Sequence, residues 1–207
     1  MSADYPVTPQ AANPFYLGGG GDGFLSHIEQ GGFNLLASTF VGTPSFDQNY
    51  FIEIDAFDQV YVVGQTEGQF FVSPGTYSNA GSGQYIARFT SDLTLLDRST
   101  VFGKGDGDPD LSPTAMLIDQ CNNVYVSGWG GATNFFAQNP DTDITGLPTT
   151  PDAYQSTTDG SDFYFIVFGE DMDSLLYATY FGGDLSEEHV DGGTSRFDSR
   201  GAIYQAV

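Results

Sequence analysis

The sequence predicts an all-β protein built from propeller-type blades of four antiparallel strands. Three stretches of the chain align with one another, and their aligned elements are short, rich in β-branched or aromatic residues and bounded by turn-formers. The composition agrees with this prediction. The 207 residues include 27 Gly, 10 Pro, 18 Phe and 12 Tyr, a balance that favours strands and turns. We therefore expect essentially no α-helix.

The repeat contains four elements, and each of them occurs three times. The first elements read FLSHIE, YIARFT and FYFIVF, at residues 24–29, 85–90 and 163–168. The second elements read LLASTFVG, LLDRSTVFG and LLYATYFG, at residues 35–42, 95–103 and 175–182. The third elements read IEID, MLID and SRFD, and they end at Asp55, Asp119 and Asp198. The fourth elements read VYVVG, VYVSG and IYQAV, and they begin at Val60, Val124 and Ile203.

The turn between the third and fourth elements has a recurring chemistry. Its leading aspartate precedes a tyrosine by six residues in every copy, and three positions after the aspartate stands Asp58, Asn122 or Gly201. An aspartate can accept backbone N–H bonds across such a turn, and Asp, Asn and Gly best tolerate a positive φ. We interpret these carboxylates as structural, with catalysis as the alternative.

The repeat divides the chain into blades, with the aspartate-terminated strands innermost. Two complete blades are expected at 46–105 and 106–185, flanked by the outer half of a blade at 1–45 and the inner half of a truncated blade at 186–207. The two halves could complete one blade, but three blades are fewer than the four to eight of closed propellers. We expect an open partial propeller. The chain also has no signal peptide and ends within a strand-like run, so we expect a fragment of a longer protein.

Proline-rich spacers separate the strands of each copy. They read YPVTP, VSPGTY and PTTPDAY, at residues 5–9, 72–77 and 148–154. Proline fixes φ and has no N–H to donate to a ladder, so these spacers are expected to be ordered loops outside the sheets.

These motifs carry a family resemblance. The combination of DGF, LLYATYFGG, VYVSG and PTTPDAY resembles the SBBP β-propeller repeat of bacterial secreted and cell-surface proteins. The stretch EHVDGGTSRFD at 188–198 further resembles large gliding-motility-associated surface proteins of the Bacteroidota. The resemblance covers nearly the whole chain and implies an extracellular or cell-surface location. It identifies a scaffold and supplies no catalytic residue.

The charge excludes several classes of partner. Five Lys and Arg against 27 Asp and Glu give a net charge of −22, which repels nucleic-acid phosphates and anionic lipid. No apolar run approaches the roughly 20 residues that a transmembrane helix needs. The single cysteine, Cys121, excludes an internal disulfide framework.

The best metal candidate is the loop with Asp106, Asp108 and Asp110. Alternating carboxylates in a Gly/Pro loop can converge on Ca²⁺, which takes six to eight oxygens. The alternative is a solvated connector, because the twelfth position of an EF-type loop would be Leu117 rather than Glu. No other cofactor is expected. A second oxygen-rich set, read either as a metal site or as hydrogen-bonded loop residues, comprises Glu187, Glu188, His189 and Asp191.

The remaining candidates have structural alternatives. Trp129 with Phe135 and Phe136 could stack on a sugar ring or pack between blades. His27 occupies an alternating strand position, and the sequence has no Gly-x-Ser-x-Gly nucleophile setting, so a hydrolase triad is not supported. Cys121 falls in a turn, and we expect an inert thiol.

The sequence therefore predicts a non-enzymatic scaffold, adhesion or protein-interaction module of a large bacterial surface protein. Its expected partners are other blades of the full-length protein and a surface glycan or protein. The alternatives are a glycan-binding lectin and a propeller hydrolase that acts on polysaccharide through paired aspartates. The fold does not choose among them.

Overall fold

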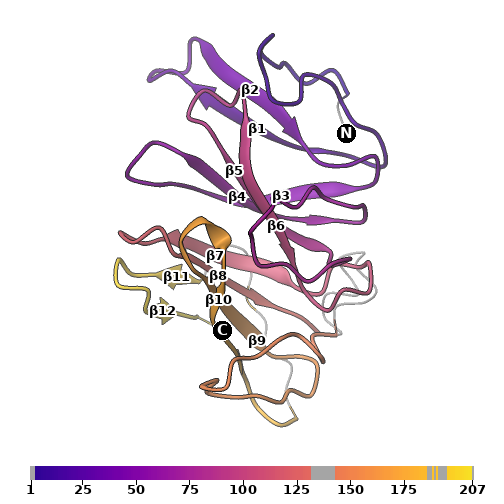
Figure 1. The fold of residues 1–207 in the computed structure, drawn as a ribbon, viewed down its shortest axis with the longest axis vertical. Helices are drawn as coiled ribbons and strands as arrows, with labels where there is room; N and C mark the ends of the chain where they lie inside the picture. The colour runs from indigo at the N-terminus through magenta and orange to yellow at the C-terminus, as the bar shows by residue number, and fades with distance from the viewer. Residues whose placement is uncertain (1–2, 132–142, 186–187, 189, 191–194, 207) are drawn as a thin grey trace.

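The computed structural model describes residues 3–131, 143–185, 188, 190 and 195–206, and these residues form antiparallel sheets arranged along one axis (Figure 1). The strands are β1 (Gly23–Ile28), β2 (Leu35–Val41), β3 (Asp47–Ile54), β4 (Val60–Thr66), β5 (Gln84–Phe89), β6 (Leu96–Phe102), β7 (Ser112–Ile118), β8 (Val124–Trp129), β9 (Phe163–Phe168), β10 (Leu175–Phe181), β11 (Arg196–Phe197) and β12 (Ile203–Tyr204). The described part of the chain has one turn of 3-10 helix, Glu170–Met172, and no α-helix, which confirms the all-β prediction. It holds no helix long and apolar enough to cross a membrane.

Two of the sheets have the predicted four antiparallel strands. Their strand orders are β3-β4-β5-β6 and β7-β8-β9-β10, so neighbours in sequence are neighbours in the sheet. They span Asp47–Phe102 and Ser112–Phe181 and lie inside the ranges 46–105 and 106–185. The β1–β2 sheet precedes them and the β11–β12 sheet follows them, each with two strands.

The innermost strands face one another across the sheet junctions. β3 packs against β7, and β7 packs against β11. Each of the three ends one residue before the aspartate of its repeat. This arrangement is the one expected of propeller-type blades, whose first strands lie next to each other around a common axis.

The central strand β4 is buried along its whole length because its two faces contact different sheets. Tyr61 and Val63 belong to the core shared with the β7–β10 sheet. Val60 and Val62 belong to the core shared with the β1–β2 sheet. Alternate side chains of a strand point to opposite faces, so a nearly continuous apolar run is required here.

The aspartate turns have the predicted hydrogen bonds. In each copy the aspartate Oδ1 accepts the backbone N–H groups two and four residues later. The N···O distances are 2.8 and 2.9 Å at Asp55, 2.8 and 2.9 Å at Asp119, and 2.9 and 3.0 Å at Asp198. The third residue after each aspartate has a positive φ, of 61° at Asp58, 58° at Asn122 and 82° at Gly201. The predicted hydrogen bonds and the predicted positive φ of these turns are therefore confirmed.

A backbone contact joins two of the three proline loops to the next sheet along the chain. The Ala12 N–H donates to the Leu93 carbonyl at 2.9 Å, and the Tyr77 N–H donates to the Met172 carbonyl at 2.8 Å. Leu93 and Met172 hold equivalent places in the β5–β6 and β9–β10 hairpins, with φ of 56° and 57°. Both side chains are buried, so the cores on either side hold these hairpins in place. We call this contact the loop–hairpin bond.

Replacing Asp119 with Ala should destabilise the fold. It removes the acceptor of two backbone N–H groups and of the side chains of Asn123 and Tyr125. We expect the free energy of unfolding, measured by urea denaturation, to fall by about 1–3 kcal/mol. Asp152→Ala removes the same charge from an exposed loop and should change stability by less than about 0.5 kcal/mol. Equal losses in the two variants would contradict the role given to the turn.

Candidate functional site

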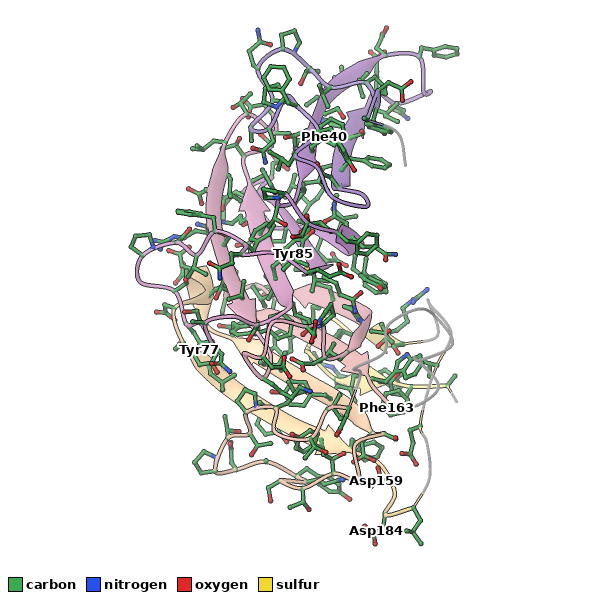
Figure 2. The ribbon with its side chains drawn as sticks, turned by 90° about the vertical axis from the view of Figure 1, so that its right-hand side faces the viewer. Phe40, Tyr77, Tyr85, Asp159, Phe163 and Asp184 are labelled. Carbon is green, nitrogen blue, oxygen red and sulfur yellow. The ribbon has the colours of Figure 1, made fainter. Side chains whose placement is uncertain are left out.

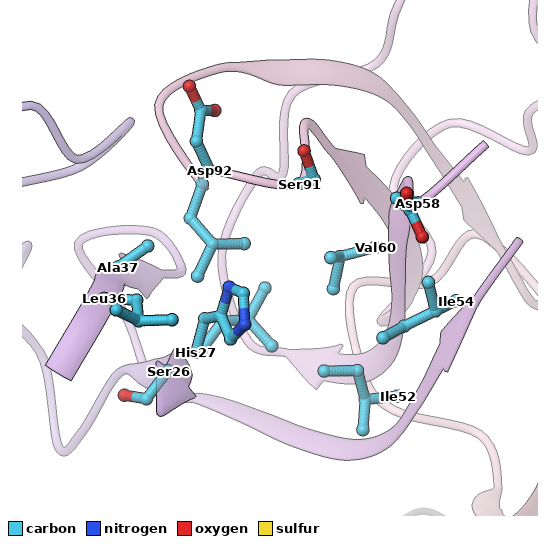
Figure 3. Close-up of a pocket in the computed structure, with 12 residues that line it drawn as sticks. Ser26, His27, Leu36, Ala37, Ile52, Ile54, Asp58, Val60, Ser91 and Asp92 are labelled. Carbon is cyan, nitrogen blue, oxygen red and sulfur yellow. The ribbon is translucent and has the colours of Figure 1, made fainter. Parts of the chain in front are cut away.

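A groove of about 610 Å³ lies between the β1–β2 sheet and the β3–β6 sheet (Figure 3). Its walls come from β1, β2, β3, β4 and the β5–β6 hairpin. The apolar lining residues are Leu25, Leu36, Ala37, Ile52, Ile54, Val60 and Leu93. The polar lining residues are Ser26, His27, Asp58, Ser91 and Asp92.

The two carboxylates at this groove belong to hairpin turns. Asp92 Oδ1 accepts the hydroxyl of Thr90 at 2.6 Å and the hydroxyl and N–H of Thr94 at 2.8 and 3.2 Å. These hydrogen bonds, from Thr90 first, lower the pKa of Asp92. Asp58 is the positive-φ residue of the first aspartate turn. His27 lies on β1 opposite Ala37 on β2. The groove is therefore a mainly apolar cleft whose lining includes two carboxylates from hairpin turns.

The predicted calcium loop is organised by a lysine. Lys104 Nζ lies 3.1 Å from Asp110 Oδ1 and 3.2 Å from Asp106 Oδ2. Asp110 is fully buried, whereas Asp106 and Asp108 are exposed. No three His, Cys, Asp or Glu side chains come together as a metal site in the part of the chain that the structure describes. The structure thus brings Asp106 and Asp110 together through Lys104, and calcium at the three aspartates stays a prediction.

The same loop shows a feature that recurs at every sheet junction. A glycine follows the outermost strand, and the N–H of the residue after it donates to an acidic side chain in the connection to the next inner strand or at the start of that strand. The three bonds run from Thr43 to Asp47 at 2.6 Å, from Lys104 to Asp110 at 2.8 Å and from Gly183 to Glu188 at 3.2 Å. We call Asp47, Asp110 and Glu188 the junction acids.

The glycine is needed because the carboxylates lie against its Cα. A Cβ at Gly42 would come within 2.7 Å of Asp47 Oδ2, and one at Gly103 within 2.3 Å of Asp110 Oδ2. The spacing from glycine to acid is five, seven and six residues in the three copies, so a fixed-spacing comparison misses it. The sequence signal for this contact is a glycine directly after each outer strand, followed by an acidic residue within seven residues.

A second acid stands beside the junction acid in the first and third copies. Asp22 and Asp162 immediately precede β1 and β9, and the corresponding residue before β5 is Gly83. Both aspartates are buried. Burial raises the pKa of Asp22, and the charge of Asp47 raises it further. Burial likewise raises the pKa of Asp162, and Glu188 adds to the rise. The two flanking junctions therefore hold pairs of carboxylates, whereas the middle junction holds one carboxylate and a lysine.

The other candidate residues differ in their burial. Trp129 is buried and packs with Phe163 and Val190. Cys121 is exposed, and its N–H donates to Asp119 in the second aspartate turn. Trp129 is thus positioned as a packing residue. Several candidates lie outside the described residues, namely Phe135, Phe136, Glu187, His189 and Asp191.

Comparison with protein-family models and with curated proteins gives no match. The resemblance to the SBBP repeat therefore remains an expectation carried by the motifs quoted above. The structure itself contributes the all-β architecture, the four-stranded antiparallel sheets and the repeated junction chemistry.

The buried acids make stability depend on pH. Burial raises the pKa of Asp110 to about 6, despite the opposing effect of Lys104, and the unfolded value is about 3.9. Between these values the folded state holds a proton that the unfolded chain releases. Lowering the pH from about 7.5 to 5 should therefore raise the free energy of unfolding, with Asp110 contributing on the order of 1 kcal/mol. Urea denaturation at the two pH values measures this.

Asp110→Asn serves as the variant for this prediction, since an amide oxygen can still accept the Lys104 N–H. We expect the difference between the two pH values to shrink but not to vanish, because burial also raises the pKa of Asp22, Asp47 and Asp162. A protein that is less stable at pH 5 than at pH 7.5 would contradict the prediction.

Proposed function

We propose that this chain is a non-enzymatic scaffold or protein-interaction module of an extracellular bacterial surface protein, and that its lateral faces bind further blades of the same type. The main support is the loop–hairpin bond, which two of the three proline loops make and the third does not make.

Tyr77 and Tyr154 hold the same place in successive proline loops, which align as SPGTY and TPDAY. Tyr77 lies where the loop of the β3–β6 sheet meets the next sheet (Figure 2). Its ring centroid is 5.8 Å from that of Phe168. The Tyr154 N–H instead donates to Tyr177 Oη within its own sheet, at 3.3 Å, and its side chain is 76% exposed. Tyr154 thus has the position of an inter-blade residue, and among the described residues its N–H is bonded to no hairpin of a following sheet.

The apolar surface around Tyr154 agrees with this interpretation. Phe181 closes β10 as Phe102 closes β6, yet Phe181 is 48% exposed and Phe102 is fully buried. The Tyr154 and Phe181 rings lie 5.7 Å apart, centroid to centroid. Together with Leu176 and Ile203 they line a cleft of about 500 Å³ between the β7–β10 and β11–β12 sheets. An exposed apolar cleft of this kind is typical of an interaction surface.

A second copy of this chain offers a matching hairpin. In the β1–β2 hairpin the Gly32 N–H donates to the Glu29 carbonyl at 2.8 Å, and Gly32 has a φ of 75°. Leu93 and Met172 make the same local bond in their own hairpins, to the residue three before them. The Gly32 carbonyl therefore corresponds to the acceptors of the two loop–hairpin bonds, and it can accept the Tyr154 N–H of a second copy.

Two further observations support a scaffold over the alternatives. The burial of Trp129 removes the aromatic face that a lectin would offer to a sugar ring. The charge of −22 and the small number of lysines suit a surface-exposed protein that avoids nonspecific binding to nucleic acid and anionic lipid. The extracellular location itself rests on the resemblance to the SBBP repeat.

Sedimentation velocity tests the docking face, with a second copy of the chain as the probe. We expect reversible head-to-tail association over roughly 1 µM to 1 mM, the range of weak specific contacts. Tyr154→Ser should weaken it about tenfold, equivalent to about 1.4 kcal/mol. Phe57→Ser, which changes an equally exposed aromatic in the first aspartate turn, should leave it unchanged. A chain that stays monomeric throughout, or equal effects of the two variants, would overturn the proposed face.

A further inference from the structure

The middle sheet junction carries its own cation. Lys104 contributes twice there, because its N–H donates to Asp110 Oδ2 at 2.8 Å and its Nζ lies 3.1 Å from Asp110 Oδ1. Both oxygens of this fully buried carboxylate therefore have a positively polarised partner. Such a partner is what a carboxylate needs when it is removed from water.

The first junction has the same hydrogen bond from a backbone N–H to the junction acid, but no basic side chain pairs with its carboxylates. Thr43 holds the place of Lys104, and its N–H and hydroxyl donate to Asp47 Oδ2 at 2.6 and 2.9 Å. Asp22 holds the place of Gly83 and accepts the Leu17 N–H on Oδ2 at 2.6 Å. The ion pairs of Arg88, Arg98, Lys104 and Arg200, which are those found within the described residues, involve neither Asp22 nor Asp47.

The second oxygen of each carboxylate is buried without a hydrogen bond. Among the described residues, Oδ1 of Asp22 and Oδ1 of Asp47 receive none, although the two residues are only 7% and 1% exposed. Oδ1 of Asp110 also accepts no hydrogen bond, but there the ammonium of Lys104 lies 3.1 Å away. The Gly21 carbonyl accepts the Asp47 N–H at 2.8 Å, so the chain segments that carry the two carboxylates lie side by side. Two like charges held together in a buried place repel each other unless a cation or a proton lies between them.

The groups around the pair are hard oxygens. The Thr43 hydroxyl lies 2.9 Å from Asp47 Oδ2, and the Thr66 hydroxyl lies 3.4 Å from that of Thr43. Carboxylate, hydroxyl and carbonyl oxygens in irregular geometry suit Ca²⁺ better than Mg²⁺, which demands a near-ideal octahedron. Two carboxylates rather than three or four correspond to the weak range of extracellular calcium modules, with Kd of about 0.1–1 mM.

We propose that Asp22 and Asp47 form a calcium site at the junction of the β1–β2 and β3–β6 sheets, where the ion takes the part that Lys104 plays at the next junction. The site joins the loop before β1 to the first residue of β3. Calcium therefore stabilises the packing of the two sheets against each other. This site is separate from the predicted loop at Asp106, Asp108 and Asp110, and it does not depend on the proposed scaffold function.

Thermal unfolding tests the site. The unmodified chain in about 10 mM CaCl₂ should melt about 3 °C higher than in NaCl of equal ionic strength, which provides equal screening. Asp22→Asn keeps an oxygen for the Leu17 N–H and removes one charge, so this variant should lose the calcium increment. Asp108→Asn removes one charge from the exposed loop and should keep the full increment.

A spectroscopic measurement separates binding from stability. The Tyr85 hydroxyl donates to Asn49 Oδ1, two residues after Asp47, and its pKa is raised by burial first and then by the charges of Asp47 and Asp22, so both carboxylates lie within electrostatic range of Tyr85. Tb³⁺ in the site should therefore emit when tyrosine is excited, and Ca²⁺ should quench this emission by displacement. Tyr85→Phe should reduce the emission and keep the thermal increment. Two results would overturn the site: no increment over NaCl in the unmodified chain, or an increment that Asp108→Asn abolishes and Asp22→Asn keeps.

Discussion

The need of a four-stranded sheet to bury apolar side chains on both of its faces is the constraint on which this structure depends. β4 contributes alternate residues to two different cores, one shared with the sheet before it and one with the sheet after it. A sheet of this kind exposes apolar side chains wherever a neighbour is missing, as the exposure of Phe24 on β1 and Phe181 on β10 illustrates. Stability is therefore a property of sheet junctions more than of single blades, as in other repeat proteins.

Much of the fold could be predicted because the local chemistry repeats. The aspartate turns could be predicted because each is defined by one aspartate side chain and one residue with a positive φ. Both residues lie within four positions of each other in the sequence. The order of the strands followed from the order of the repeated elements along the chain, since sequence neighbours tend to be neighbours in the sheet. These are short-range features, and three copies of each made them stand out from chance.

The repeated contact of the junction acids was not predicted, although Asp110 and Glu188 were among the candidate residues, because the connection between sheets varies in length and carries no fixed motif. The calcium prediction at Asp106, Asp108 and Asp110 considered only the carboxylates. It did not consider Lys104, which stands two residues before Asp106 and pairs with Asp106 and Asp110. Whether an acid is buried beside another acid is decided by contacts between distant segments, such as the Asp47 N–H on the Gly21 carbonyl. Trp129 is a similar case, since an aromatic residue at a strand end can stack on a ligand or pack inside, and its packing depends on contacts with Phe163 and the distant Val190.

Several of the few basic side chains lie next to acidic side chains at the junction of the two four-stranded sheets. Arg88 is almost buried and pairs with Asp97 at 2.5 Å and with Asp171 at 2.6 Å, the latter on the 3-10 turn of the next sheet. These partners and the Tyr61 hydroxyl raise the pKa of Arg88 against the opposing effect of its burial. In a chain of charge −22, the guanidinium groups of Arg88 and Arg98, which both pair with Asp171, and the ammonium group of Lys104 thus support the junction between the two four-stranded sheets.

The loop–hairpin bond has a consequence for how such arrays grow. Its donor and acceptor are main-chain atoms, so Ala12 and Tyr77 make it equally well, and so do Leu93 and Met172 as acceptors. The joint therefore places little demand on side-chain identity. A blade duplicated within the gene finds a compatible neighbour at once, before any compensating substitution. Its copies can then diverge on their solvent-facing loops while the joints between blades stay interchangeable.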